Sequence, residues 1–320
     1  MATGHAGPLA DPWSVLLVAV LLADLALLAV LGTRVRRRTS WRESWRLARG
    51  GPLSAQRFGG LAIAIVGTRW LLLSAVAWKA SIPDLHPFAF DASLHAFDQR
   101  LHASKAAWRH LEPLLASGRF MRGLDLFYRF WYPALAYMVI RVGWRPPSPR
   151  RRQFLLSLAL VWSVGSVAAV LVSSAGPAYF QRLTGDPAYA GLIARLTELG
   201  LAARTIQEAL WGSDGRGSTA VIAGIAAFPS LHVAMPALCA LRAWPESRYA
   251  ALGWWGFTLV TLTGSVALGW HYAVDGYAAI AGTAALWCLA GRMTGVAIRP
   301  SPTRPGGASR RRAARTGTGR

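Results

Sequence analysis

The sequence predicts an all-α membrane protein, a polytopic helical bundle with about seven transmembrane helices. Apolar residues make up 53% of the 320 residues, charged residues only 15%, and the mean hydropathy is +0.32. The apolar residues gather in runs of roughly twenty, which at about 1.5 Å per residue can cross a hydrocarbon layer of ~30 Å. This composition and clustering exclude a disordered chain and an ordinary soluble domain.

Hydropathy divides the chain into seven apolar spans joined by polar loops. The spans cover residues 13–32, 61–78, 127–140, 153–173, 229–244, 249–270 and 272–291. No Lys or Arg precedes the first span, and the basic cluster 34–38 follows it. That order is typical of an anchor with its N-terminus outside, and not of a cleaved signal peptide.

The formal charge of +21 could indicate a nucleic-acid partner, so the distribution of the basic residues decides its meaning. Most of the 35 Lys and Arg residues lie in the loops 33–60 and 141–152 and in the tail after residue 291. The positive-inside rule makes these segments cytoplasmic and puts the N-terminus and the loops 80–126 and 174–228 outside. We therefore expect an integral plasma-membrane protein with a cytoplasmic C-terminus and no nucleic-acid partner.

The segment 91–115 in the first outer loop is too polar to span a membrane, but it has one apolar helical face. The apolar residues at helical spacing are Leu94, Phe97, Leu101, Trp108, Leu111 and Leu115. We expect a helix that lies in the outer interface or caps the bundle. His95, His102 and Lys105 are interpreted as solvated side chains on it.

Four residues inside the spans have polar or sulfur-containing side chains of interest. Asp24 and Arg69 lie near the middle of the first two spans, where an interhelical ion pair is expected. Cys239 and Cys288 also fall inside spans and show neither a disulfide pattern nor metal-ligand spacing, so they are interpreted as packing residues. The sequence predicts no metal site and no cofactor.

Two short elements combine residue types that can carry out phosphoryl chemistry. One is Pro229-Ser230-Leu231-His232 at the start of the fifth span, and the other is His271-x-x-x-Asp275 at the start of the seventh. The predicted topology brings both to the outer face. Either element alone is equally well explained as a helix start with a capping residue, so the coincidence of the two supports a catalytic site.

The chemistry follows from the residue types and their spacing. Pro229 is expected at the first helical position, where the free amides and the Ser230 hydroxyl would attract phosphate. Asp275 would orient His271 from the next turn of the same helix and leave its other nitrogen free to attack phosphorus. His232 would give a proton to the leaving group.

At these residues the chain resembles the type 2 phosphatidic acid phosphatase superfamily, over about residues 125–292. The family has a P-S-x-H element and an H-x-x-x-D element. The resemblance implies that His271 is the nucleophile that forms a phosphohistidine, that Asp275 is its partner, that His232 is the acid, and that Ser230 contacts the phosphate. The resemblance also implies a core of six helices.

The chain departs from the family pattern at the residues that bind phosphate. Ser265-Val266 replaces the usual Ser-Arg, and no K-x6-R-P element is found on the outer side. Gly176-Pro177-Ala178-Tyr179-Phe180 follows the fourth span instead, which resembles the branch containing inositol phosphorylceramide synthases. Tyr179 is assigned to substrate binding on this resemblance. Arg182 and Arg216 are the candidate phosphate cations, although both could be ordinary loop arginines.

These observations divide the chain into four segments. An anchor helix and a basic loop cover 1–60, a second span and an outer loop 61–126, a phosphatase-like catalytic core 127–292, and a disordered basic tail 293–320. The expected partners are a membrane lipid substrate and an alcohol or polyol acceptor. The oligomeric state is left open.

The leading hypothesis is a metal-independent lipid phosphotransferase with its active site on the extracytoplasmic side, similar to inositolphosphotransferases. One alternative is a phosphatase for lipid phosphates or isoprenyl diphosphates, with water as the acceptor at the same site. A second alternative is a bundle that binds or translocates lipids without catalysis. An intramembrane protease is disfavoured because Ser230 and His232 are two positions apart on a helix and point away from each other.

Overall fold

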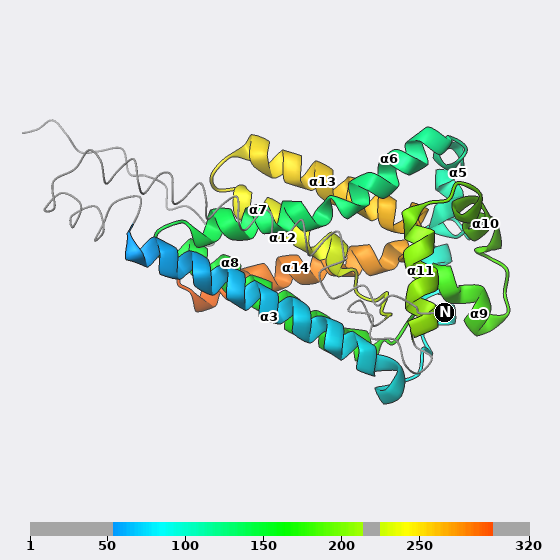
Figure 1. Cartoon of the computed structure of the whole chain (residues 1–320), viewed down its shortest axis with the longest axis horizontal. Helices are drawn as coiled ribbons and strands as arrows, with labels where there is room; N and C mark the ends of the chain where they lie inside the picture. The colour runs from blue at the N-terminus through cyan, green and yellow to red at the C-terminus, as the bar shows by residue number, and fades with distance from the viewer. Residues whose placement is uncertain (1–53, 214–224, 297–320) are drawn as a thin grey trace, which may run out of the picture. The chain divides into compact units, whose positions relative to one another are not determined.

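The computed structural model describes residues 54–213 and 225–296, and every regular element in this part of the chain is a helix (Figure 1). The helices are α3 (Ala55–Leu85), α4 (Asp91–Leu101), η1 (Ala107–Leu111), α5 (Glu112–Leu115), α6 (Gly118–Arg129), α7 (Trp131–Gly143), α8 (Pro149–Leu171), η2 (Pro177–Tyr179), α9 (Phe180–Thr184), α10 (Ala190–Glu198), α11 (Ala202–Ser213), α12 (Leu231–Ala243), α13 (Arg248–Ala267) and α14 (Ala273–Met293). The first predicted span, with Asp24, and the candidate cation Arg216 lie outside the described residues.

The described residues belong to two compact units. In the smaller unit, residues 54–70 pack against residues 136–147. The ring of Phe58 meets that of Trp144 edge-on at 5.1 Å, and a Cβ placed on Gly143 would lie 2.9 Å from the Cβ of Ala64. The larger unit comprises Leu71–Leu135 and the described residues from Ser148 onward, and it contains every described residue of the candidate site.

Within residues 54–213 and 225–296, four helices are long and apolar enough to cross a membrane, which fits an integral membrane protein. They are the segment Gln56–Pro83 of α3, and α8, α13 and α14. The prediction of an all-α membrane protein is therefore confirmed for the described residues, while the count of seven spans is not. The expected span 127–140 is interrupted at Phe130, which caps α6, and α7 has only 13 residues.

The fifth expected span, 229–244, is a shorter helix than hydropathy suggested. Helix α12 has 13 residues, or about 20 Å, which is less than a ~30 Å hydrocarbon layer. It packs against α8, α13 and α14, and every residue from Val233 to Ala240 is buried. A helix that is apolar on all sides is typical of a protein core as well as of a membrane span, so its hydropathy here reflects burial within the bundle.

The helices around α12 approach closely where a glycine removes a side chain. A Cβ on Gly276 of α14 would lie only 2.2 Å from Cδ1 of Leu262 on α13. The same Cβ would lie 3.5 Å from Cγ2 of Val233 on α12. Gly276 therefore allows the start of α14 to pack tightly against two neighbouring helices, directly after the His271-x-x-x-Asp275 element.

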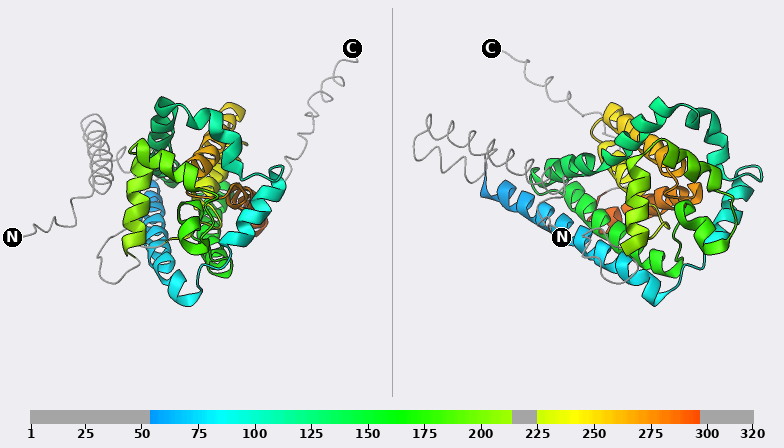
Figure 2. Two further views of the ribbon diagram at one scale, coloured as in Figure 1. Left: turned by 90° about the vertical axis from the view of Figure 1, so that its right-hand side faces the viewer. Right: turned by 45° about the vertical axis from the view of Figure 1, so that its right-hand side comes forward.

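One end of the larger unit is covered by short helices. Figures 1 and 2 show α4 (cyan) and α9–α11 (green) together at the end where α14 begins. The buried carboxylate of Asp98 on α4 connects this cover to the bundle. Its Oδ1 accepts the amides of Ala273 and Val274 at 2.9 and 3.3 Å, and its Oδ2 accepts the amide of Ala107 at 2.9 Å.

A second aspartate of α4 makes a similar set of contacts. Oδ1 of Asp91 accepts the amide of Gly176 and the hydroxyl of Tyr272, both at 2.8 Å, and Oδ2 accepts the amide of Ala175 at 2.9 Å. Because each amide would otherwise be buried without an acceptor, these contacts fix where the neighbouring loops lie.

The expectation of one interfacial helix over 91–115 is wrong. The helix ends after Leu101, the chain turns through Ala103 and Ser104 with φ of 52° and 62°, and η1 and α5 follow. His95 is not solvated but buried, and Nε2 of His102 lies 2.9 Å from the hydroxyl of Tyr277 on α14. A helix forms over α4, but its predicted apolar face is only partly buried: Leu94 is buried, whereas Phe97 and Leu101 are exposed and Asp91 and Asp98 are buried in their place. Lys105 is exposed as expected.

We expect Asp98→Ala to destabilise the protein by roughly 3 kcal/mol, because it leaves three buried backbone amides without an acceptor. Thermal unfolding of the full chain in detergent micelles would measure the change. Glu198→Ala is the matched control, since its side chain is 67% exposed and removing it should cost less than about 0.5 kcal/mol. Equal unfolding temperatures for the two variants would contradict the assignment.

Candidate active site

Three loops meet beside the start of α14 in the larger unit. The amide of Ala227 donates to the carbonyl of Ser174 at 2.9 Å, and the amide of Ala178 donates to the carbonyl of Gly269 at 2.9 Å. Gly176 has φ of 94°, and a Cβ there would lie 2.7 Å from the carbonyl oxygen of Trp270. This position therefore requires glycine for both backbone conformation and space.

The predicted nucleophile His271 lies in the loop just before α14. Its Nδ1 is 3.5 Å from Oδ2 of Asp275, which also accepts the amide of Tyr272 at 3.0 Å. Asp275 is completely buried, and the exposed fraction of His271 is 7%. Because Nδ1 faces the carboxylate, Nε2 is the nitrogen left for attack.

The predicted pairing of His271 with Asp275 occurs, but not through one shared helix face. Helix α14 begins at Ala273 with Tyr272 as its N-cap, so His271 is outside the helix and Asp275 is the third helical residue. The amides of Trp270 and His271 both donate to the carbonyl of Ser265, at 2.9 and 3.2 Å. This loop turn brings the imidazole to the carboxylate. The carboxylate is a helix cap and a partner of His271 at once.

Ser230 connects the two sequence elements directly. It is the N-cap of α12, and its amide donates to the carbonyl of Asp275 at 3.2 Å. The side chain is fully buried, and its hydroxyl has no hydrogen-bond partner among the described residues. The expectation for Pro229 is corrected: it precedes the N-cap after a cis bond to Phe228, and Leu231 is the first helical residue.

His232, the second residue of α12, is surrounded by aromatic rings. Its imidazole stacks on Tyr128 with centroids 4.9 Å apart and planes inclined by 10°, and the ring of Trp131 lies at 4.5 Å. Tyr132 approaches edge-on at 6.2 Å. The imidazole interacts electrostatically with that of His271, so the two histidines lie in one region of the structure.

The residues assigned to substrate binding on the outer loop have other partners. The buried Tyr179 donates its hydroxyl to the carbonyl of Gln207 at 2.9 Å and stacks on Trp211. Arg182 donates to both carboxylate oxygens of Glu208 at 2.8 Å. That hydrogen bonding lowers the pKa of Glu208, whose carboxylate also pairs with Arg204.

A cation that the sequence reasoning missed lies in α3. Lys79 is half-buried near the end of that helix, and it interacts electrostatically with His232. No ion pair is found for it among the side chains that the structure describes, which do not include that of Asp84 on the same helix. A cation in an apolar span is costly, so Lys79 is a candidate functional residue.

The spacing after Lys79 is the signal that could have identified it. His86-Pro87 follows after six intervening residues, so the K-x6-R-P spacing is kept with His at the place of Arg. The carbonyl of His86 accepts the hydroxyl of Ser173 at 3.0 Å, which ties this segment to the loops of the site. A pattern restricted to Arg-Pro does not include this segment.

The described residues contain no group of three or more His, Cys, Asp or Glu side chains that could hold a metal ion. Both cysteines are free, with Cys239 buried in α12 and Cys288 exposed on α14. The chemistry available at the site is that of two imidazoles, a buried carboxylate, a buried hydroxyl and a cation.

The fold and the site define a helical membrane protein with paired histidine elements at one end of its bundle. A family model described as the PAP2 superfamily matches residues 92–289, which is more than half of the chain. The chain belongs to the PAP2 superfamily, and this membership indicates phosphatase or phosphotransferase chemistry. The match begins in α4, earlier than the core expected from residue 127, and Lys79 precedes it. No curated protein and no solved structure matches the chain.

We expect Ser230→Ala to leave the unfolding temperature nearly unchanged, because the hydroxyl it removes makes no hydrogen bond among the described residues. Ser173→Ala is the matched comparison. Its hydroxyl is equally buried but donates to the carbonyl of His86, so its loss should cost about 1 kcal/mol. If Ser230→Ala were the more destabilising variant, the Ser230 hydroxyl would have a structural role.

Proposed function

We propose that the protein is an integral membrane lipid phosphotransferase that works at the extracytoplasmic face through a phosphohistidine, like the inositolphosphotransferases it resembles. The observation that carries this proposal is the hydrogen bond from the Ser230 amide to the Asp275 carbonyl. It joins the P-S-x-H and H-x-x-x-D elements, and it brings an unused hydroxyl beside the imidazole and carboxylate pair.

In the first step, Nε2 of His271 attacks the phosphorus of the bound lipid, and the bond from phosphorus to the leaving oxygen breaks. His232, which must enter this step as the imidazolium, gives a proton to that oxygen and becomes neutral, so the leaving group departs as an alcohol. The carboxylate of Asp275 stabilises the positive charge that develops on His271. The Ser230 hydroxyl donates to a phosphoryl oxygen.

In the second step, a hydroxyl of the acceptor attacks the same phosphorus and gives its proton to His232. The bond from Nε2 to phosphorus breaks, which restores neutral His271. Protons and electron pairs balance over the two steps, and neither step requires a metal. The aromatic rings of Tyr128 and Trp131 hold the imidazole of His232 in one orientation through both steps.

Lys79 supplies the positive charge that the phosphoryl group requires. Arg182 is held in an ion pair with Glu208, which also pairs with Arg204, whereas no ion pair is found for Lys79 among the described side chains. A preorganised cation in a partly dehydrated site stabilises charge that develops on phosphoryl oxygens.

A second candidate function is a phosphatase for lipid phosphates or isoprenyl diphosphates. The same site would serve, with water as the acceptor in the second step. This candidate is favoured by membership in the PAP2 superfamily, whose members are generally phosphatases. The proposed membrane is the plasma membrane, with the N-terminus outside and the C-terminus in the cytoplasm.

The covalent intermediate provides the test of the proposed function. Brief incubation with a phosphorus-labelled phospholipid should leave acid-labile label on the purified protein, and His271→Ala should abolish both the label and turnover. His232→Ala should lower turnover by roughly 10²- to 10⁴-fold. Tyr249→Phe, a change at a residue of α13 that is 88% exposed, is the control.

Normal turnover in both His271→Ala and His232→Ala would reject the catalytic assignment, and absence of any turnover in the native chain would favour a lipid-binding or translocating protein. Adding inositol distinguishes the proposed phosphotransferase from the alternative phosphatase. Release of free phosphate regardless of inositol would identify a phosphatase and reject the transferase.

We expect Lys79→Gln to lower the turnover number by roughly a hundredfold, as for removal of one group that stabilises transition-state charge, and Lys79→Arg to restore much of it. Arg69→Gln removes an exposed cation from the same helix and should have little effect. Steady-state kinetics in detergent or lipid micelles would measure both. Equal activities of Lys79→Gln and Arg69→Gln would exclude Lys79 as the phosphate cation.

A further inference from the structure

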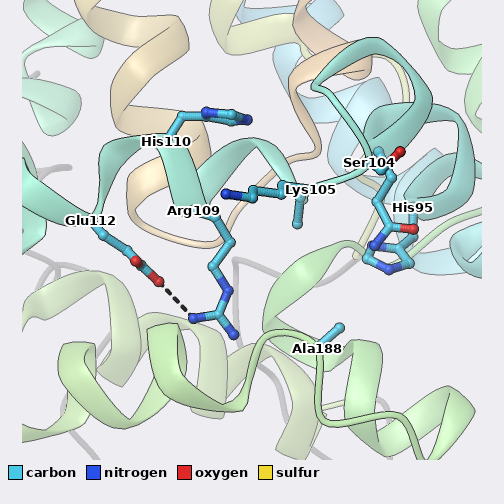
Figure 3. Close-up of a pocket in the computed structure, with 9 residues that line it drawn as sticks. His95, Ser104, Lys105, Arg109, His110, Glu112 and Ala188 are labelled. Carbon is cyan, nitrogen blue, oxygen red and sulfur yellow. Dashed lines mark hydrogen bonds and ion pairs between the residues drawn. The ribbon is translucent and has the colours of Figure 1, made fainter.

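A polar cavity of about 430 Å³ lies in the cover of the bundle, away from the histidine elements (Figure 3). It opens between α4, the turn 102–106, η1 and the segment before α10. We call it the outer cavity, and its polar walls include His95, Ser104, Lys105, Arg109, His110 and Glu112. Its volume is within the range of roughly 300 to 1,000 Å³ that is typical of small-molecule sites.

The permanent charges of the outer cavity favour an anion. Arg109 donates to Glu112 at 2.6 Å, and its guanidinium also lies 4.1 Å from the ring centre of Trp108. Lys105 has no carboxylate partner within the described ranges. Two cations therefore face one carboxylate, and the ammonium of Lys105 remains available to a ligand (Figure 3).

The imidazole of His95 adds a neutral hydrogen-bond donor. Nδ1 of His95 lies 2.9 Å from the hydroxyl of Tyr189. Burial lowers the pKa of His95 and raises that of Tyr189, so the imidazole is neutral and the hydroxyl keeps its proton. With the hydroxyl donating to Nδ1, the proton of His95 resides on Nε2. Nε2 of His110 donates to the carbonyl of His102 at 3.0 Å.

The turn that carries Lys105 has a strained backbone. Ala103 and Ser104 both have positive φ, which is uncommon for residues other than glycine. The turn is held by the amide of Ser104, which donates to the carbonyl of Gln99 at 2.8 Å. Strain of this kind is concentrated at ligand-binding sites, where the surrounding structure maintains it.

We propose that the outer cavity binds the phosphate group of a phosphorylated polyol, either free or as the headgroup of a phospholipid. A guanidinium, an ammonium, a hydroxyl and the Nε2 proton of His95 match the oxygens of a phosphate ester, and the remaining acceptors match the hydroxyls of a polyol. This site is separate from His271 and does not depend on the proposed phosphoryl transfer.

The outer cavity is linked to the catalytic element through Asp98. One carboxylate oxygen accepts the amide of Ala107, next to the cavity wall, and the other accepts the amides of Ala273 and Val274, directly after Tyr272. A ligand that holds the turn 102–106 in place also holds the start of α14.

The test uses the full chain with His271→Ala, so that no turnover occurs, in phosphatidylcholine nanodiscs. Titration with glycerol 3-phosphate, followed by calorimetry, should show saturable binding, and glycerol alone should show none. Adding Lys105→Glu should weaken the binding at least about tenfold, as expected for the loss of a charge-assisted contact. Arg119→Glu makes the same charge change at an exposed residue of α6, outside the cavity. It should leave the affinity for glycerol 3-phosphate within about twofold.

Absence of binding, or equal affinities for the Lys105→Glu and Arg119→Glu proteins, would overturn the proposal. Because the protein is catalytically inactive throughout, either result would leave the phosphotransferase proposal unaffected. Nanodiscs that contain phosphatidylglycerol identify the source of the phosphate. A lower apparent affinity for glycerol 3-phosphate there supports a lipid headgroup in the cavity, and an unchanged affinity supports a soluble ester.

Discussion

Buried carboxylates that accept backbone amides are the interaction on which the rest of the structure depends. Asp91 and Asp98 on α4 together accept five amides and one hydroxyl, from the loop after α8, from η1 and from the start of α14. A buried charge is costly unless it is fully hydrogen-bonded, and a buried amide is costly without an acceptor. Each group therefore satisfies the other, and the loops have one favourable arrangement.

At the site itself, Asp275 is a third buried carboxylate that accepts a backbone amide. Its carboxylate caps the start of α14 through the amide of Tyr272 and also faces Nδ1 of His271. The capping explanation and the catalytic explanation of the H-x-x-x-D element are consequently not alternatives. The amide contact holds the carboxylate where it can orient the imidazole, which is the arrangement that general acid-base and nucleophilic chemistry both require.

The short central helix determines where the second histidine lies. Because α12 is enclosed by α8, α13 and α14, its first residues lie within the protein and not on its surface. Ser230 is buried with its hydroxyl unused, and His232 is held among aromatic rings. Lys79 on α3, for which no ion pair is found among the described side chains, interacts electrostatically with His232. A polar site inside an apolar bundle is costly unless a charged ligand completes it.

The sequence by itself determined the helical class, the long apolar helices α3, α8, α13 and α14, and the two histidine elements. The reason is that the length of a segment, its hydropathy and the spacing of nearby residues depend only on the order of residues along the chain. It could not distinguish a membrane span from a core helix at 229–244, since both are apolar on every side. It also misassigned the polar residues of 91–115, because burial of Asp98 and His95 depends on partners far along the chain. Only the tertiary structure decided which cations are free to act. Arg182 and Lys79 carry the same charge, but Arg182 is hydrogen-bonded to Glu208, whereas no ion pair is found for Lys79 among the described side chains.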